Sequence, residues 1–392
     1  MQEWDTPVHD RRRTQASTLR RVDSQNAPVI SRHGAATSTN ELLHDAASVL
    51  LPGGADHITL PDDFTGGALL GTAQANGVLG PLLFSLPDSA DDLREQVTAA
   101  YEPVLLWCLE LELRLLEIKG WFEDVGGIDF RVLKGPAVAH LDELDPSLRS
   151  FADIDLLIPA RDIDRALAVL QRHGAQRRIP EHHRGFDRRF SKGVGLTCGD
   201  GIEIDLHRTL AMGALGQRIP LDELFESPEQ FDIGGQQFAA LSLPHRALHS
   251  AYHAVIGSPT PALKTLRDLA GYLTRPTLTP ELLVPEARRW GGATVLAEAV
   301  RAAFANLTFD APIWRIWADD FSPDSDDEEL IRHSQYESAA PYDLAFIREL
   351  PWRDRAAYVW GTAWPSKQTL DSRGVTHWSR IRHGIANLRR SQ

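Results

Sequence analysis

Hydrophobic residues follow two different spacings along the chain. Over residues 39–124 and again over 241–392, apolar residues recur at intervals of three and four, the period of a helix that buries one face. Over residues 125–240 they form shorter runs, several of which alternate with polar residues as in half-buried strands. The pattern predicts an α+β fold, in which a mixed sheet with its own helices is flanked by an N-terminal and a C-terminal helical segment.

The first 38 residues are polar and show no periodicity, so we expect a disordered leader over residues 1–38. Helices are predicted beyond it over residues 67–83 and 90–123, with a kink in the second at Pro103. In the second helix, four leucines keep a spacing of three and four: Leu106, Leu109, Leu113 and Leu116. This spacing predicts that they form the stripe that packs against the next domain.

The central segment reads as alternating strands and helices. Gly126-Gly127 ends the long helix, and residues 128–133 are β-branched and aromatic enough for a strand. Pro136 is placed to begin a helix that runs to Leu141. Beyond it we expect a strand stopped by Pro159 and an amphipathic helix closed by Gly174. Further strands are predicted over three ranges: 186–190, 194–197 and 202–207.

The last third of the chain is predicted to be helical. Four helices are expected, over residues 245–256, 262–273, 280–290 and 293–305. Residues 321–329 form an acidic stretch without the central glycine and ligand spacing of a calcium-binding EF-hand, so we expect a solvated loop. Residues 377–390 are expected to form a basic, helix-like tail.

Composition narrows the class of protein. The 392 residues are enough for two domains, and a hydrophobic content of 43% is ordinary for a globular protein. No apolar run of about 18 residues is present, which argues against a membrane span or a secretory signal. Only two cysteines occur, Cys108 and Cys198, so a disulfide framework and a cysteine-based zinc site are excluded. We therefore expect a reduced, cytoplasmic setting.

The net charge of −13 argues against general binding of nucleic acid, which needs a basic surface. One basic segment, over residues 177–192, is a candidate for binding a small phosphorylated ligand. Its basic residues are Arg177, Arg178, His182, His183, Arg184, Arg188, Arg189 and Lys192.

Two acidic strands carry the candidate chemistry. Asp153 and Asp155 flank Ile154, so on a strand both carboxylates point to one face, about 7 Å apart. Two carboxylates at that distance repel each other unless a cation lies between them. The segment Ile202-Glu203-Ile204-Asp205-Leu206-His207 repeats the alternation about fifty residues later. If the two strands adjoin, they form a divalent-metal site of the kind used in phosphoryl transfer.

These motifs resemble the nucleotidyltransferase superfamily with a DNA polymerase β-like palm. Within it, three segments look like the family of uncharacterised nucleotidyltransferases: Val132-Leu133-Lys134-Gly135, Arg149-x-x-x-Asp153-Ile154-Asp155-Leu156-Leu157 and Ile202-x-Ile204-Asp205-Leu206-His207. Lys-Gly followed by Arg and Asp-x-Asp also resembles the nucleotidyltransferase toxins of abortive-infection systems. The resemblance extends over residues 40–390 through the preceding helices, residues 266–270 and Trp364-Pro365-Ser366.

The resemblance implies the roles of individual residues. Asp153, Asp155 and Asp205 would be the catalytic carboxylates and would bind two Mg²⁺ ions, with Mn²⁺ as an alternative. Lys134, Gly135 and Arg149 would bind the nucleoside triphosphate. An acceptor hydroxyl on a small molecule, a protein or an RNA would attack the α-phosphorus and release pyrophosphate, with Asp205 lowering the pKa of that hydroxyl or accepting its proton. The acceptor would bind in the cleft between palm and helices.

The chain departs from the superfamily at the glycine turn. The usual turn is Gly-Ser or Gly-Gly, whereas Pro136 follows Gly135 here and offers no backbone donor to a phosphate. Lys134 and Arg149 would therefore supply more of the nucleotide binding. An inactive binding or scaffold protein with this fold is one alternative function, and a toxin-like enzyme that nucleotidylates tRNA or protein is another.

Several residues have two interpretations. Glu203 shares a strand face with Asp205 and is the alternative third carboxylate. The family-like Asp-Leu-His motif at residues 205–207 favours Asp205. His207 is interpreted as a packed or hydrogen-bonded histidine rather than as a ligand. A further three histidines, His245, His249 and His253, lie on one helix face, where polar packing is preferred over a zinc half-site.

Overall fold

The protein is described here by a computed structural model that covers residues 35–60, 67–258, 260–323, 325–335, 340–372 and 376. Residues 1–34 of the expected leader and the whole basic tail over residues 377–390 lie outside these ranges. Residues 35–38, which the sequence pattern assigns to the leader, belong instead to helix α2 (Ala35–Ser48).

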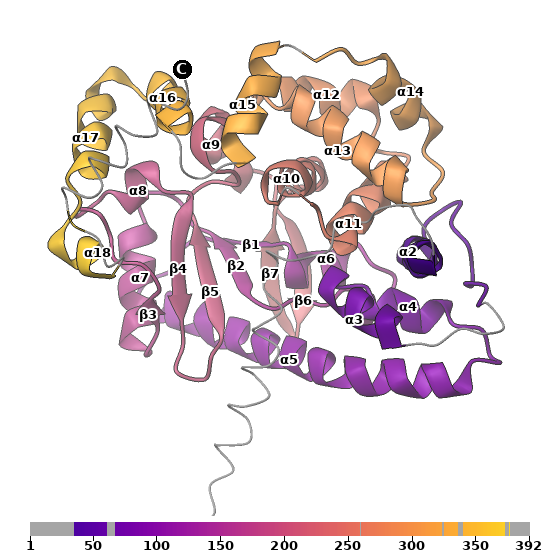
Figure 1. Cartoon of the computed structure of the whole chain (residues 1–392). Helices are drawn as coiled ribbons and strands as arrows, with labels where there is room; N and C mark the ends of the chain where they lie inside the picture. The colour runs from indigo at the N-terminus through magenta and orange to yellow at the C-terminus, as the bar shows by residue number, and fades with distance from the viewer. Residues whose placement is uncertain are drawn as a thin grey trace, which may run out of the picture.

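A seven-stranded mixed sheet lies at the centre of the fold, which confirms the predicted α+β class (Figure 1). Its strands are β1 (Arg131–Leu133), β2 (Ile154–Leu157), β3 (Gln176–Arg177), β4 (Gly193–Thr197), β5 (Glu203–His207), β6 (Glu229–Ile233) and β7 (Gln236–Ala240). The order across the sheet is β3-β4-β5-β2-β1-β7-β6. Strand β2 pairs with β5 and β1 with β7 in parallel, whereas the other neighbours are antiparallel.

The two faces of the sheet pack against different helices. Side chains such as Ile154 and Ile204 form one core with α5 (Asp91–Asp124) and α7 (Ile163–Arg172). On the other face, Leu133 and Leu157 join a second core, which includes residues of α10 (Leu243–Ile256) and α11 (Leu263–Leu273). In Figure 1, α5 runs beneath the strands and α10 lies above them. The charged residues of the acidic strands point to the face that α10 covers.

The N-terminal helices share the second core with the C-terminal ones. The predicted helix over residues 67–83 is in fact two helices, α3 (Gly67–Asn76) and α4 (Leu79–Ser85). They are separated at Gly77, whose φ of +67° suits glycine. Helices α2, α3 and α4 pack with α10 and α11 in one hydrophobic cluster. One face of the sheet therefore packs in a core built from both the N-terminal and the C-terminal helices.

Most of the leucine stripe predicted to be buried on α5 is exposed to solvent. Leu106, Leu109 and Leu113 are 55%, 55% and 63% exposed, and only Leu116 packs against the core. The buried stripe consists instead of Leu93, Val97, Tyr101, Cys108, Leu111, Leu115, Ile118 and Phe122. Apolar residues occur on more than one side of this helix, so spacing alone did not decide which side is buried. Pro103 lies inside the helix, as predicted.

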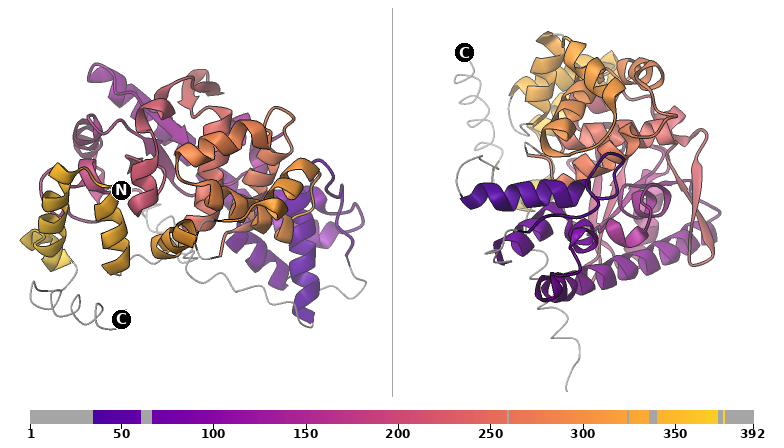
Figure 2. Two further views of the ribbon diagram at one scale, coloured as in Figure 1. Left: turned by 90° about the horizontal axis from the view of Figure 1, so that it is seen from above. Right: turned by 90° about the vertical axis from the view of Figure 1, so that its right-hand side faces the viewer.

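The four helices predicted after residue 244 are confirmed as α10, α11, α12 (Pro280–Arg289) and α13 (Ala293–Asn306). Further helices follow: α14 (Pro312–Asp320), α15 (Ser325–Gln335), α16 (Ala340–Glu349), α17 (Trp352–Ala363) and α18 (Lys367–Ser372). Helices α17 and α18 lie at the opposite end of the molecule from α2 (Figure 2). Among the described helices, none combines the length and the apolar composition that crossing a membrane requires.

Two local predictions were wrong. Residues 187–190 form helix α8 (Asp187–Phe190) rather than a strand. Its aromatic residue Phe190 packs with α16 and α17, partners that are remote in sequence. The acidic stretch predicted as a loop is largely the first turn of α15, where carboxylates are favourable because they oppose the positive end of the helix dipole. The β6–β7 hairpin, which turns at Gly234-Gly235, was not predicted.

Candidate active site

The register between β2 and β5 brings the two acidic strands together. Asp155 lies directly opposite Asp205, and Leu157 lies opposite His207. Ligand atoms of Asp155, Asp205 and His207 all lie within 4.8 Å of one another. Glu203, the first residue of β5, lies two residues before Asp205 and pairs with Thr197 of β4. Side chains at alternate positions of a strand share a face, so this group faces α10.

Asp155 is the buried centre of the group. Its Oδ2 accepts a hydrogen bond from Lys134 Nζ at 3.1 Å, and its Oδ1 lies 2.5 Å from His207 Nε2. Burial alone would raise the pKa of Asp155, but Lys134 and His207 outweigh it and hold the pKa well below its usual range. Asp155 is therefore ionised and fixed in position.

Asp153 precedes β2 and is partly exposed. The negative charge of Asp155, and then burial, raise the pKa of Asp153 to about 6, with a further contribution from Asp205. The raised pKa therefore reflects repulsion between neighbouring carboxylates together with burial. A divalent cation would relieve that repulsion, and carboxylate oxygens are the ligands such ions prefer.

Lys134 and Gly135 form a constrained turn between β1 and α6 (Gly135–Leu141). Lys134 has a φ of +46°, which is uncommon for a residue with a side chain, and Gly135 has a φ of +21°. A Cβ on Gly135 would lie 3.2 Å from Phe151. Strained backbone of this kind persists where the surrounding structure requires it, often at functional sites. Here it directs Lys134 onto Asp155.

Strand β4 carries two glycines beside the acidic residues, and the guanidinium of Arg178 occupies the space at one of them. Gly193 pairs with His207, and Gly195 pairs with Asp205. A Cβ on Gly195 would lie 2.4 Å from Nε of Arg178, so the guanidinium occupies the space that a side chain would fill. From there Arg178 reaches Glu203 Oε2 at 2.7 Å and also Asp205. The alternating glycines at 193 and 195 are the sequence signal that could have identified this strand as part of the site.

Arg149, which the resemblance assigns to the triphosphate, is engaged by other groups. Its Nε and one terminal nitrogen donate to the two carboxylate oxygens of Asp268 at 2.7 and 2.8 Å, and another donates to the Ser150 carbonyl at 2.5 Å. Both side chains are buried. The Asp268 charge outweighs burial and raises the pKa of Arg149 further.

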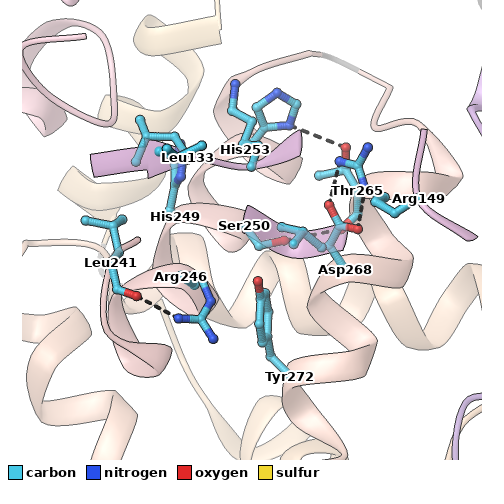
Figure 3. A pocket seen from close by; sticks show the side chains of 13 residues that line it. Leu133, Arg149, Leu241, Arg246, His249, Ser250, His253, Thr265, Asp268 and Tyr272 are labelled. Carbon is cyan, nitrogen blue, oxygen red and sulfur yellow. Dashed lines mark hydrogen bonds and ion pairs between the residues drawn. The ribbon is translucent and has the colours of Figure 1, made fainter. Parts of the chain in front are cut away.

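A small cavity separates the Lys134 turn from α10 and α11 (Figure 3). Its volume of about 30 Å³ is enough for about two water molecules, and so too small for a nucleotide. It is lined by Val132, Leu133, Lys134, Val138, Arg149, Leu241, Arg246, His249, Ser250, His253, Thr265, Asp268 and Tyr272. A nucleotide bound at the acidic residues would therefore lie outside this cavity.

The three histidines of α10 pack separately. His249 and His253 face the cavity, and burial, with Lys134 and Lys192 nearby, holds the pKa of each well below its usual value. His245 lies 3.6 Å from Glu286 and packs against Trp290. In the described part of the chain, they join no cluster of potential metal ligands. This arrangement agrees with polar packing.

Two lysines beside the site were not among the predicted site residues. Lys192 was noted only as part of the basic segment, and Lys264 begins α11 without any motif around it. Burial lowers the pKa of each to about 8, aided by Lys134 beside Lys192 and by Arg149 beside Lys264, while Asp153 acts in the opposite direction. A Cβ on Gly77 would lie 2.4 Å from Lys264 Cδ, so this glycine makes room for the lysine.

The rest of the basic segment is largely neutralised by carboxylates. Arg177 pairs with Asp187, Arg188 with Asp164 at 3.2 Å, and Arg189 with Asp354. His183 lies against the Trp364 carbonyl at 2.5 Å. The segment therefore does not present one continuous basic surface.

The donor set fits a divalent cation. Two carboxylates and an imidazole converge, and His207 Nδ1 is buried without a hydrogen-bond partner among the described residues. Burial lowers the pKa of His207, despite Asp155 beside it, so its ring is neutral and able to act as a donor ligand or to orient Asp155.

Comparison with known proteins yields a family and weak structural likeness to solved structures. The model of a family described as uncharacterised nucleotidyltransferase matches residues 62–308. A solved structure of an antigenic nucleotidyltransferase-like protein from Paracoccidioides brasiliensis is similar over 53% of this chain and 96% of that chain, with 14% identity and a TM-score of 0.31. None of the curated proteins matches this chain. Because the family model spans more than half of its length, the chain belongs to the uncharacterised nucleotidyltransferase family.

Proposed function

We propose that this protein is a Mg²⁺-dependent nucleotidyltransferase that transfers a nucleoside monophosphate from a nucleoside triphosphate to a hydroxyl acceptor and releases pyrophosphate. The observation that carries the proposal is the pairing of Asp155 with Asp205 across two parallel strands. Family membership supports the transferase class.

Asp155 and Asp205 are the residues proposed to hold the cation, with Asp153 as the third carboxylate. A bound divalent cation neutralises phosphate charge and lowers the pKa of a hydroxyl that contacts it. The pKa of Asp153 is raised chiefly by the charge of Asp155, so a cation at this position would relieve that repulsion and lower the pKa of Asp153. Asp205 is the proposed acceptor of the hydroxyl proton.

Three lysines are proposed to bind the triphosphate. Lys134 is already charged, because Asp155 and Asp153 outweigh the effect of burial on its pKa. Lys192 and Lys264 have a pKa of about 8, and an approaching polyanion would raise it and hold both in the charged form. Arg149 contributes positive charge behind Lys264 while Asp268 holds its guanidinium.

Isothermal titration calorimetry with each nucleoside triphosphate and Mg²⁺ tests the proposal. We expect at least one nucleotide to bind, and Asp155→Asn to abolish that binding because it removes the ionised, buried carboxylate. Asp164→Asn is the matched control, because Asp164 is an exposed carboxylate on α7 that pairs with Arg188. This variant should bind the nucleotide as the wild type does. If no nucleotide binds, or if Asp155→Asn binds normally, the proposal is wrong.

A binding protein without turnover is the second candidate, favoured by Pro136. This residue is buried at the start of α6, where other members of the superfamily would offer a backbone N–H to phosphate. Incubating the protein and a lysate with α-labelled nucleotide separates the two candidates. Label transferred to a small molecule, a protein or an RNA, and absent with Asp155→Asn, supports the enzyme. Tight binding without any transfer supports the binding protein.

A further inference from the structure

Arg178 forms an ion pair with Asp205, one of the proposed metal ligands. Its guanidinium bridges two carboxylates of β5, those of Glu203 and Asp205. The three side chains are 38%, 37% and 30% exposed, so Arg178 can move without unpacking the core. A guanidinium bound to a carboxylate and a cation coordinated by that carboxylate compete for the same charge and the same oxygen lone pairs.

The backbone places Arg178 at this position. Its N–H donates to the Gly195 carbonyl at 2.9 Å, which fixes the residue beside β4, and the missing side chain of Gly195 leaves space for the guanidinium. The preceding residue, Arg177, pairs with Asp187 instead. Of these two adjacent arginines, only Arg178 reaches the acidic strands.

We propose that Arg178 is a positioning residue that competes with the divalent cation for Asp205 and that Glu203 retains it when the cation binds. This inference rests on the proposed function, because it takes Asp205 as a metal ligand. It also gives Glu203 a separate role: the carboxylate that shares the strand face with Asp205 anchors the arginine and does not bind the metal.

The arrangement couples the metal site to anionic ligands. When a cation takes the place of Arg178 on Asp205, the planar guanidinium keeps its contact with Glu203. Its remaining N–H donors are then free beside the acidic strands. A nucleoside triphosphate is the chemical class that would meet a freed guanidinium there, because its phosphates accept such bidentate donors. Arg178 therefore weakens binding of the cation alone and strengthens binding of the cation together with the nucleotide.

Titration of the full chain with Mn²⁺ alone, followed by the electron paramagnetic resonance of free Mn²⁺, tests the competition. We expect Arg178→Gln to bind Mn²⁺ about two- to fivefold more tightly than the wild type, since removing an exposed ion pair has effects of that order. Arg178→Lys keeps the charge but does not span both carboxylates, so its affinity should be intermediate. Arg188→Gln, an exposed arginine paired with Asp164, is the control and should change affinity less than about twofold.

The double variant decides the role of Glu203. If Glu203 only anchors the arginine, Arg178→Gln/Glu203→Gln should bind Mn²⁺ as Arg178→Gln does. If the double variant loses Mn²⁺ as Asp205→Asn does, Glu203 is a ligand and the inference is wrong. Unchanged or weaker affinity in Arg178→Gln also overturns it. If the proposed function itself is wrong, a different result is expected: Asp155→Asn and Asp205→Asn would leave Mn²⁺ binding unaffected.

Discussion

Two clusters of charged residues lie within the fold, and they differ in how completely the charges are matched. Between the sheet and α10–α11, each of three buried or nearly buried carboxylates faces a guanidinium. Both oxygens of Asp142 bind Arg246 at 2.9 Å, Glu143 binds Arg267 at 3.0 Å, and Asp268 binds Arg149. These pairs join segments more than one hundred residues apart.

At the acidic strands one carboxylate is unmatched, although Arg178 pairs with Glu203 and Asp205. Asp155 has Lys134 and His207, but Asp153 has no hydrogen bond or ion pair within the described ranges. Repulsion from Asp155 is the main reason why the pKa of Asp153 rises to about 6. The comparison teaches that removing one partner of a matched buried pair is costly, whereas the unmatched charge of Asp153 is itself a cost that a ligand would offset. Substitutions at the two clusters should therefore have opposite effects on stability.

The largest effect is expected from breaking the matched cluster. Arg149→Met leaves Asp268 buried and unpaired, so the free energy of unfolding should fall by about 3–5 kcal/mol. Urea denaturation followed by circular dichroism measures this. Arg149→Met/Asp268→Leu removes both charges and should recover most of the loss. A single variant as stable as the wild type would contradict the structural role given to this pair.

A smaller effect of opposite sign is expected at the unmatched cluster. Asp153→Asn removes the carboxylate that Asp155 repels, so the free energy of unfolding at pH 7 and without metal should rise by about 1–2 kcal/mol. Asp187→Asn is the control, because this carboxylate pairs with Arg177 outside the site and its loss should not stabilise the protein. Destabilisation by Asp153→Asn would show that the charges at the site are already balanced.

The pH dependence of this gain has a defined sign. In the folded protein the pKa of Asp153, about 6, is higher than its unfolded value of 3.8, so between these values the folded state binds more protons than the unfolded state. The unfavourable contribution of Asp153 is therefore fully present above pH 6 and disappears as the pH falls toward 4. The stability difference between Asp153→Asn and wild type should be largest at pH 7 and smaller at pH 5, measured by urea denaturation at both.

The acidic half of the site was readable from sequence because its signal is local. Asp153-Ile154-Asp155 and Glu203-Ile204-Asp205 show the period of two that puts carboxylates on one strand face. The register that sets Asp155 beside Asp205 joins residues fifty positions apart, and only the resemblance to a family indicated it.

The remaining parts of the site depend on contacts that spacing does not encode. Lys264 lies near Asp153 because α11 packs in one core with residues of the sheet, and Arg178 reaches β5 because its N–H donates to the Gly195 carbonyl. The exposed leucines of α5 make the same point for the fold, since Leu106 and Leu111 both belong to plausible apolar stripes. Which stripe is buried depends on the neighbours of the helix.

The smallest effect is expected where the same chemistry occurs at the surface. Arg178 binds Glu203 and Asp205 through a guanidinium, as Arg149 binds Asp268, but its side chain is 38% exposed whereas that of Arg149 is 5% exposed. Water solvates an exposed arginine and its carboxylates when they separate, so Arg178→Gln should change the free energy of unfolding by less than about 1 kcal/mol. Urea denaturation of Arg178→Gln beside Arg149→Met measures the contrast. If Arg178→Gln lowered the free energy of unfolding as much as Arg149→Met does, the difference in burial would not explain the difference between the two clusters. A small decrease together with tighter Mn²⁺ binding would assign Arg178 to the site and Arg149 to the stability of the fold.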